Sequence, residues 1–237
     1  MFRRLRETEP DRLSLRLSKT LQPFTVVPWG ALAMWYLGVP IAVGAPIIVV
    51  QDNNYTAVIK RLESAGFKQS VPNRVPPSEI IENHPNPQQV LEEINAGYEH
   101  LDRSCAGFDY PNGEPTEKGL QLYLFPNMFA HSFQDDSPRP LTEAKDGAPR
   151  KRFETYGNLC YPLEQTLLES FVKTAIDEET EKGFSAWGES LRSWVSLMTG
   201  RNFGRIHEAN FGPIDRRVTK RLGSGKEIPV DMRVNPI

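Results

Sequence analysis

Residues 29–40 constrain the fold most, because they join a buried helix to a turn that stops it. The segment is apolar on nearly every side up to Leu37, which indicates burial rather than a solvated face. Gly38 is suited to end the helix, and the proline two residues later prevents its continuation. Residues 46–51 form a short apolar run rich in β-branched residues, which is typical of a central strand. We therefore predict a helix beginning at Pro28, a tight turn and a buried strand.

The composition excludes several classes of protein. The net charge of -2 creates no overall field for nucleic acid or an anionic membrane, so we expect neither as a partner. Cys105 and Cys160 lie far apart without metal-ligand spacing, which favours a reducing compartment. The apolar run 32–50 is broken by glycines and prolines, and no signal core follows the N-terminus. We expect a cytoplasmic or nuclear protein and no cofactor.

The first part of the chain mixes predicted helices with predicted strands. A helix over residues 55–65 follows the capping side chains of residues 52–54, and a short strand near residues 67–71 completes a βαβ-type unit. A helix over residues 88–103 and a strand over residues 119–126 follow a proline-rich stretch. Residues 11–21 alternate like a strand but contain helix-forming residues, so both alternatives stay open.

The last part of the chain has a helical pattern. Apolar residues recur at helical spacing over residues 161–181 and again over residues 184–198. A further short helix is predicted over residues 214–222 in a polar tail. We divide the chain into an α/β part (1–133), a polar loop or linker (134–152) and a helical part with an irregular tail (153–237).

The helix, turn and strand resemble the frame of the polymerase-β type of minimal nucleotidyltransferase fold. In that family a Gly-Gly or Gly-Ser pair opens the helix, a Gly-Val-Pro-like turn follows, and the next strand carries Asp-x-Asp. Here Gly30 and Ala31 open the helix, residues 38–40 make the turn, and residues 47–50 make the strand. The chain also resembles poorly characterised fungal proteins that share this frame. The resemblance implies an α+β fold, with a mixed sheet, flanking helices and a helical C-terminal part.

The resemblance also shows which residues are missing. The paired acids of the family hold two divalent cations, and by position they would fall near Ala45 and Ile47. On the later strand the nearest polar side chains are Gln121 and Tyr123. We therefore predict no catalytic residue and no metal ligand, and only Gly30 and Ala31 remain as candidate nucleotide-contacting residues. Asp52 lies too far along the strand to substitute without a change of register.

Several other residues allow a structural and a functional interpretation. We expect His131 to be the histidine that faces a cleft, and we interpret it as solvated or hydrogen-bonded. The pairs Asp135-Asp136 and Glu178-Glu179 are interpreted as solvated, and Cys160 as a small buried apolar residue. The basic cluster within residues 216–221 fits a solvated helix, with phosphate or nucleic-acid contact as the alternative.

Two hypotheses for function remain. The first is a non-catalytic nucleotidyltransferase-like protein, a pseudoenzyme, that binds a nucleotide or a partner protein. The second is an enzyme: either a divergent nucleotidyltransferase with relocated acids, or one of another type that uses His131 or loop carboxylates between the two parts.

Overall fold

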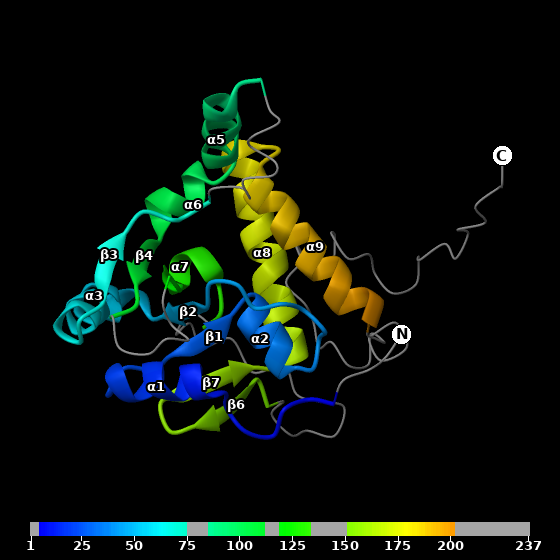
Figure 1. Cartoon of the computed structure of the whole chain (residues 1–237). Helices are drawn as coiled ribbons and strands as arrows, with labels where there is room; N and C mark the ends of the chain where they lie inside the picture. Colours follow the sequence, from blue (N-terminus) through cyan, green and yellow to red (C-terminus); the bar gives the residue numbers. More distant parts are fainter. Residues whose placement is uncertain (1–4, 75–84, 112–118, 134–150, 202–237) are drawn as a thin grey trace.

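A five-stranded mixed sheet lies at the centre of the protein (Figure 1). The computed structural model describes residues 5–74, 85–111, 119–133 and 151–201. The strand order is β1-β2-β5-β4-β3. The strands are β1 (Val27–Trp29), β2 (Ile47–Val50), β3 (Lys68–Ser70), β4 (Ala106–Asp109) and β5 (Gln121–Pro126). The α+β fold class predicted from the sequence is therefore confirmed.

The two central strands are the parallel pair of this sheet. β2 runs parallel to β5, with Ile47 opposite Tyr123, and the other neighbouring strands are antiparallel. A separate two-stranded hairpin of β6 (Phe153–Tyr156) and β7 (Leu159–Pro162) lies beside β1, joined to the chain before it by an isolated parallel bridge between Val26 and Leu159. The Val26 N–H donates to the Asn158 carbonyl at 2.8 Å, and the Cys160 N–H donates to the Val26 carbonyl at 2.9 Å.

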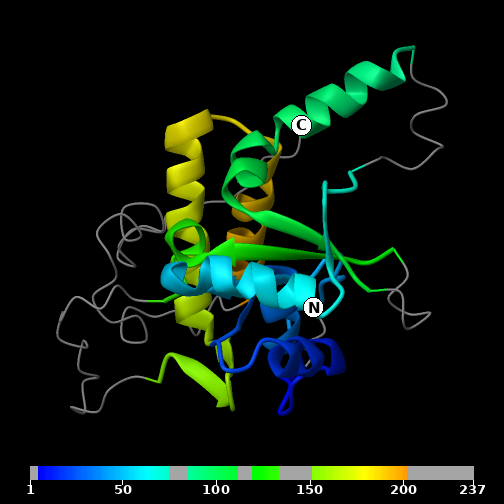
Figure 2. The same cartoon turned by 90° about the vertical axis from the view of Figure 1, so that its left-hand side faces the viewer.

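Helices surround the sheet, and α8 and α9 run side by side along it (Figure 1). The 3-10 helix η1 (Asp52–Asn54) leads directly into α3. Figure 2 shows α5 leading away from the body of the molecule. The helices are α1 (Arg12–Thr20), α2 (Ala31–Tyr36), α3 (Tyr55–Ser64), α5 (Pro87–Ala96), α6 (Glu99–Ser104), α7 (Asn127–Ala130), α8 (Glu164–Lys182) and α9 (Ala186–Arg201).

The predicted helix–turn–strand frame is present, but its start differs from the prediction. Pro28 lies in β1 rather than in a first helical turn, and α2 begins at Ala31. Gly30 makes the sharp change of direction with φ 62° and ψ -139°, which side-chain-bearing residues avoid. At the other end, the Val39 N–H bonds the Met34 carbonyl, and Gly38 has φ 78°. This Schellman-type ending is the glycine cap that the sequence predicts.

The structure corrects one further helix prediction and decides between the two alternatives left open for residues 11–21. The helix predicted over residues 88–103 is divided into α5 and α6 at Gly97, where the chain approaches the start of α9. A Cβ atom on Gly97 would lie 2.7 Å from the Ala186 Cβ, and the Trp187 N–H donates to the Gly97 carbonyl at 3.1 Å. Residues 11–21 are helical, because the Asp11 carboxylate caps α1 by accepting from the Ser14 N–H at 2.9 Å.

The helical interpretation of the last part is wrong for its first residues. Tyr161 and Pro162 belong to β7, where Pro162 lies opposite Phe153, and α8 begins only at Glu164. The structure also contains β4, which the sequence analysis did not predict. The tail helix over residues 214–222 and nearly all of the polar loop lie outside the described residues.

One cluster of buried side chains connects the sheet with α8 and α9. It contains Trp29 and Ile48 from the sheet and Phe171 and Leu191 from the two helices. Both the predicted α/β part and the predicted helical part contribute side chains to this cluster. The predicted division between them stays a prediction. Within the described segments no helix is long and apolar enough to cross a membrane.

Candidate functional site

Gly30 lies beneath side chains of the protein itself. A Cβ atom on Gly30 would lie 3.0 Å from the Ile47 Cδ1 atom and 3.0 Å from the Trp194 Cη2 atom. Gly30 is buried, and Ala31 is half-buried at the start of α2. The space next to this proposed nucleotide-contacting pair is therefore occupied by an aliphatic chain of β2 and an indole of α9.

β2 and β5, the two strands on which the resemblance would place the metal-binding acids, pair side by side. The side chains they carry at those positions cannot bind a divalent cation. Ile47 of β2 stands opposite Tyr123 of β5, and Ile47 is buried. The Gln121 amide donates to Asp109 Oδ1 at 3.0 Å and to the Val71 carbonyl at 3.0 Å, so it connects strand edges. Among the residues that the structure describes, no group of three His, Cys, Asp or Glu side chains could hold a metal ion.

An aromatic cluster fills the region between the frame and the two C-terminal helices. Trp29 lies 4.9 Å from Phe171 and 5.8 Å from Trp194, measured between ring centroids, and Trp187 lies 5.5 Å from Trp194. The Trp29 indole N–H donates to Ser170 Oγ at 2.7 Å. Such tight aromatic packing stabilises the position of α9 over β1 and Gly30.

A cleft of about 600 Å³ opens elsewhere, where the carboxyl ends of the parallel strands meet helices. Asp52 follows β2, and Pro126 ends β5. In sheets with parallel strands, ligands commonly bind outside these carboxyl ends. The lining residues come from η1, α3, α6, α7 and α8 and the end of β5: Asp52, Tyr55, Thr56, His100, Arg103, Ser104, Pro126, Met128, Phe129, Thr174, Asp177, Thr180 and Glu181.

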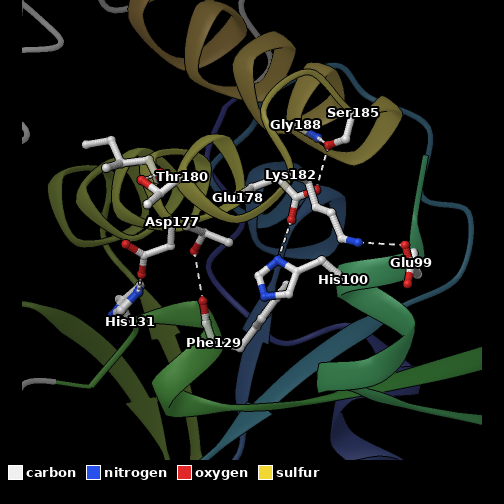
Figure 3. A network of polar contacts seen from close by, with 12 residues as sticks. Glu99, His100, Phe129, His131, Asp177, Glu178, Thr180, Lys182, Ser185 and Gly188 are labelled. Carbon is white, nitrogen blue, oxygen red and sulfur yellow. Dashed lines mark hydrogen bonds and ion pairs between the residues drawn. The ribbon is translucent and has the colours of Figure 1, made fainter. Parts of the chain in front are cut away.

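A buried carboxylate anchors one wall of the cleft (Figure 3). Glu178 is 1% exposed; its Oε2 atom lies 2.6 Å from His100 Nδ1, and its Oε1 atom accepts from Ser185 Oγ at 2.6 Å. The Ser185 hydroxyl oxygen in turn accepts from the Gly188 N–H at 3.0 Å. This network joins α6, α8 and the start of α9. Glu178 is therefore buried, and its interpretation as a solvated acid is wrong.

His131 forms the second histidine–carboxylate pair (Figure 3). Its Nε2 atom lies 2.6 Å from Asp177 Oδ2, and Asp177 lines the cleft while His131 does not. His131 follows α7 in a left-handed conformation, with φ 51°. The hydrogen-bonded interpretation of His131 is confirmed. For this cleft, the expectation that His131 is the histidine that faces it is wrong, because His100 lines the cleft instead. No local pattern could have identified His100, because its partner Glu178 is 78 residues away.

The Asp52 side chain caps a helix that lies far from it in the sequence. Its Oδ1 atom accepts from the Met128 N–H at 2.8 Å and so caps α7 rather than α3. The predicted side-chain cap of α3 by residues 52–54 is wrong, since Asn54 makes no such bond.

The thiol of Cys160 is half-buried, and burial raises its pKa, which agrees with an unreactive side chain. Asp135, Asp136 and the basic cluster 216–221 lie outside the described residues.

Comparisons with known proteins add no family to this description. No model of a known protein family matches the chain. A search of curated proteins finds no significant match either. The arguments for function therefore rest on the geometry described above.

Proposed function

We propose that the protein is a nucleotidyltransferase-like binding protein that carries out no metal-dependent transfer. The observation that supports this most strongly is that apolar side chains fill the space beside Gly30 in the helix–turn–strand frame. By the resemblance the paired acids would fall near Ala45 and Ile47, and the polar side chains of the later strand are Gln121 and Tyr123. The Trp194 indole lies directly over Gly30. Divalent cations need several hard oxygen ligands, and a two-metal mechanism needs bridging carboxylates.

The cleft supports a ligand other than a free nucleoside triphosphate. The cleft is lined by three carboxylates, those of Asp52, Asp177 and Glu181. Its lining includes one guanidinium, that of Arg103. A triphosphate brought there without metal ions would meet more carboxylates than cations, which opposes its binding. Of the two kinds of ligand expected from the sequence, a partner protein therefore fits the described surface better than a nucleotide.

Calorimetry and a transfer assay test the proposal. The full chain is titrated with each nucleoside triphosphate with and without Mg²⁺, and then incubated with labelled triphosphates in Mg²⁺ or Mn²⁺. We expect no Mg²⁺-dependent binding heat and no labelled product. Metal-dependent labelling that is lost in Asp52→Asn or Asp109→Asn would instead establish a transferase with relocated acids. Asp52→Asn is a mild change, because the amide oxygen can still accept from the Met128 N–H.

A second candidate function is acid–base catalysis by His131, which does not line the cleft itself but lies beside it, next to the cleft-lining Asp177. It is favoured by the 2.6 Å contact between His131 Nε2 and Asp177, since a carboxylate can orient an imidazole as a general base. Turnover of chromogenic acyl or phosphoryl esters that disappears in His131→Gln, but persists in His100→Gln, would support this candidate. Equal background rates in both variants and in the unchanged protein would remove it.

A further inference from the structure

The lining of the cleft offers apolar side chains to a ligand. Phe129 and Pro126 line it as buried residues, and the Tyr55 ring is half-buried. Met128 is 72% exposed, although its backbone is held in place by the bond from its N–H to Asp52 Oδ1 at 2.8 Å. A methionine side chain is flexible and polarizable, so it adapts to apolar groups of different shapes. The cleft can therefore bury an apolar side chain of a ligand beside Met128.

The rim of the cleft, which is its solvent-accessible lining, is acidic. Asp177 and Glu181 lie one turn apart on α8, so both carboxylates share one face of that helix. Asp52 adds a third carboxylate from the end of β2, whereas Arg103 supplies a single guanidinium. Like charges at the spacing of Asp177 and Glu181 repel each other. A positive group of a ligand placed near both would relieve this repulsion.

The lysine next to these acids is engaged elsewhere. Lys182 follows Glu181 directly in the sequence, yet its Nζ atom lies 2.6 Å from the Glu99 carboxylate (Figure 3). Asp177 contacts the His131 imidazole at 2.6 Å. Glu181, by contrast, makes no ion pair with any residue that the structure describes. The Glu181 carboxylate is therefore available to a cation supplied by a ligand.

We propose that the cleft binds a short segment of a partner protein in which an apolar residue stands between lysines or arginines. The apolar side chain packs beside Met128 and Phe129, and the cations reach Asp177 and Glu181 at the rim. A cleft of about 600 Å³ holds a few side chains rather than a folded domain. The charge of its lining disfavours an acidic segment. This inference rests on the proposed function, because it names the kind of partner that the binding protein takes.

Methionine methyl NMR of the full-length chain tests the proposal. The probe is a pentapeptide with blocked ends, in which a central leucine has a pair of lysines on either side. We expect the Met128 ε-methyl resonance to shift on titration until the site is saturated. The resonances of Met34 and Met198, which are buried in the core, should stay in place. The Met128→Leu variant assigns the signal, because its resonance disappears.

Matched variants and probes separate the cleft from a general attraction of charge. We expect Glu181→Lys to raise the dissociation constant of the peptide about tenfold, because it reverses a charge at the rim. Glu63→Lys makes the same change in net charge at the exposed far end of α3, outside the lining, and should change the constant less than about twofold. A probe with glycine in place of leucine should bind about fivefold more weakly. A probe with glutamates in place of the lysines should not bind.

Four results would overturn the inference. The first is no shift of the Met128 resonance with the lysine probe, and the second is equal weakening in Glu181→Lys and Glu63→Lys. The third is tighter binding of the glutamate probe, which would indicate an anionic ligand. The fourth is a Met128 shift that follows protein concentration without peptide, because a second copy of the chain would then fill the cleft. None of these results restores metal-dependent transfer, so the proposed function fails separately, through a labelled product in the transfer assay.

Discussion

Among single residues, Gly30 is restricted both by its backbone conformation and by the space around it. Its positive φ is costly for any residue with a Cβ atom, and the Ile47 and Trp194 side chains leave no room for one. The resemblance implies a phosphate-contacting role for this glycine. In the structure its glycine identity is explained by folding alone.

We expect Gly30→Ala to lower the free energy of unfolding by about 1–3 kcal/mol, the usual cost of a strained backbone position. Gly44→Ala is the matched control, because a Cβ atom there meets nothing within 4 Å. The control should stay within about 0.5 kcal/mol of the unchanged protein. Urea unfolding followed by circular dichroism measures both. Equal stability of the two variants would contradict the steric explanation.

The buried Glu178 carboxylate is the second residue with a testable structural role. We expect Glu178→Ala to cost about 3 kcal/mol, because His100 and Ser185 would lose their buried partner. Glu181→Ala, one helical turn further and exposed, should change stability by no more than about 0.5 kcal/mol. Thermal unfolding of both variants gives the comparison. A Glu178→Ala protein as stable as the control would mean that water replaces the carboxylate.

Secondary structure elements depend on caps supplied from elsewhere in the chain. The four-residue helix α7 begins after a proline, and its N-terminal amide is bound by Asp52, which lies 76 residues earlier. Such a cap attaches the end of β5 to the end of β2, on the floor of the cleft.

We expect Asp52→Ala to destabilise the protein by about 1 kcal/mol, the typical value for a lost N-terminal cap. Asn53→Ala, at the neighbouring exposed position, is the control and should be nearly neutral. Hydrogen exchange should locate the change in residues 127–131. Faster exchange in α3 instead would show that Asp52 supports the helix that follows it in sequence.

The elements also show which parts of the fold a single sequence can predict. Apolar spacing predicted α3, and a β-branched run predicted β2, because their burial follows directly from local composition. β4 was missed because it begins with Ala106 and Gly107, which have weak strand preference. The β6–β7 hairpin was missed although Gly157 and Asn158 form a turn pair between two short runs, a signal that could have identified it.

The contacts at the site were less predictable than the fold, because they join residues that are far apart in the sequence. The absence of acids near residue 47 could be read from the sequence, since a side chain's chemistry needs no neighbour. The two histidine–carboxylate contacts join residues 78 and 46 positions apart, and only the packing of α6 and α7 on α8 brings them together.

Over the whole molecule, burial sets a limit to stability at alkaline pH. Burial raises the pKa of the Cys105 thiol, and it also raises the pKa of the Tyr55 and Tyr161 hydroxyls. Each group thus holds its proton more tightly in the folded chain than in the unfolded chain. Its stabilising contribution is complete below the ordinary pKa and declines as the pH rises above that value.

We therefore expect the free energy of unfolding to fall as the pH rises from about 9, the ordinary value for a thiol, through 10, that for tyrosine. Urea titrations at pH 7, 9, 10 and 11 measure the trend. Tyr55→Phe should flatten the part above pH 10, because the titrating hydroxyl is gone. An unchanged midpoint across this range would contradict the assignment of these groups as buried and protonated.

The aromatic cluster gives the molecule an optical signature. Three of the four tryptophans, Trp29, Trp187 and Trp194, lie with ring centroids within 6.2 Å of one another, and they come from β1 and α9. Excitation absorbed by one indole can pass readily to the others, so their emission reports on the cluster as a unit. Any event that lifts α9 from the sheet would separate these rings and expose them to water. The protein thus contains an intrinsic fluorescent reporter of whether its frame is covered or open.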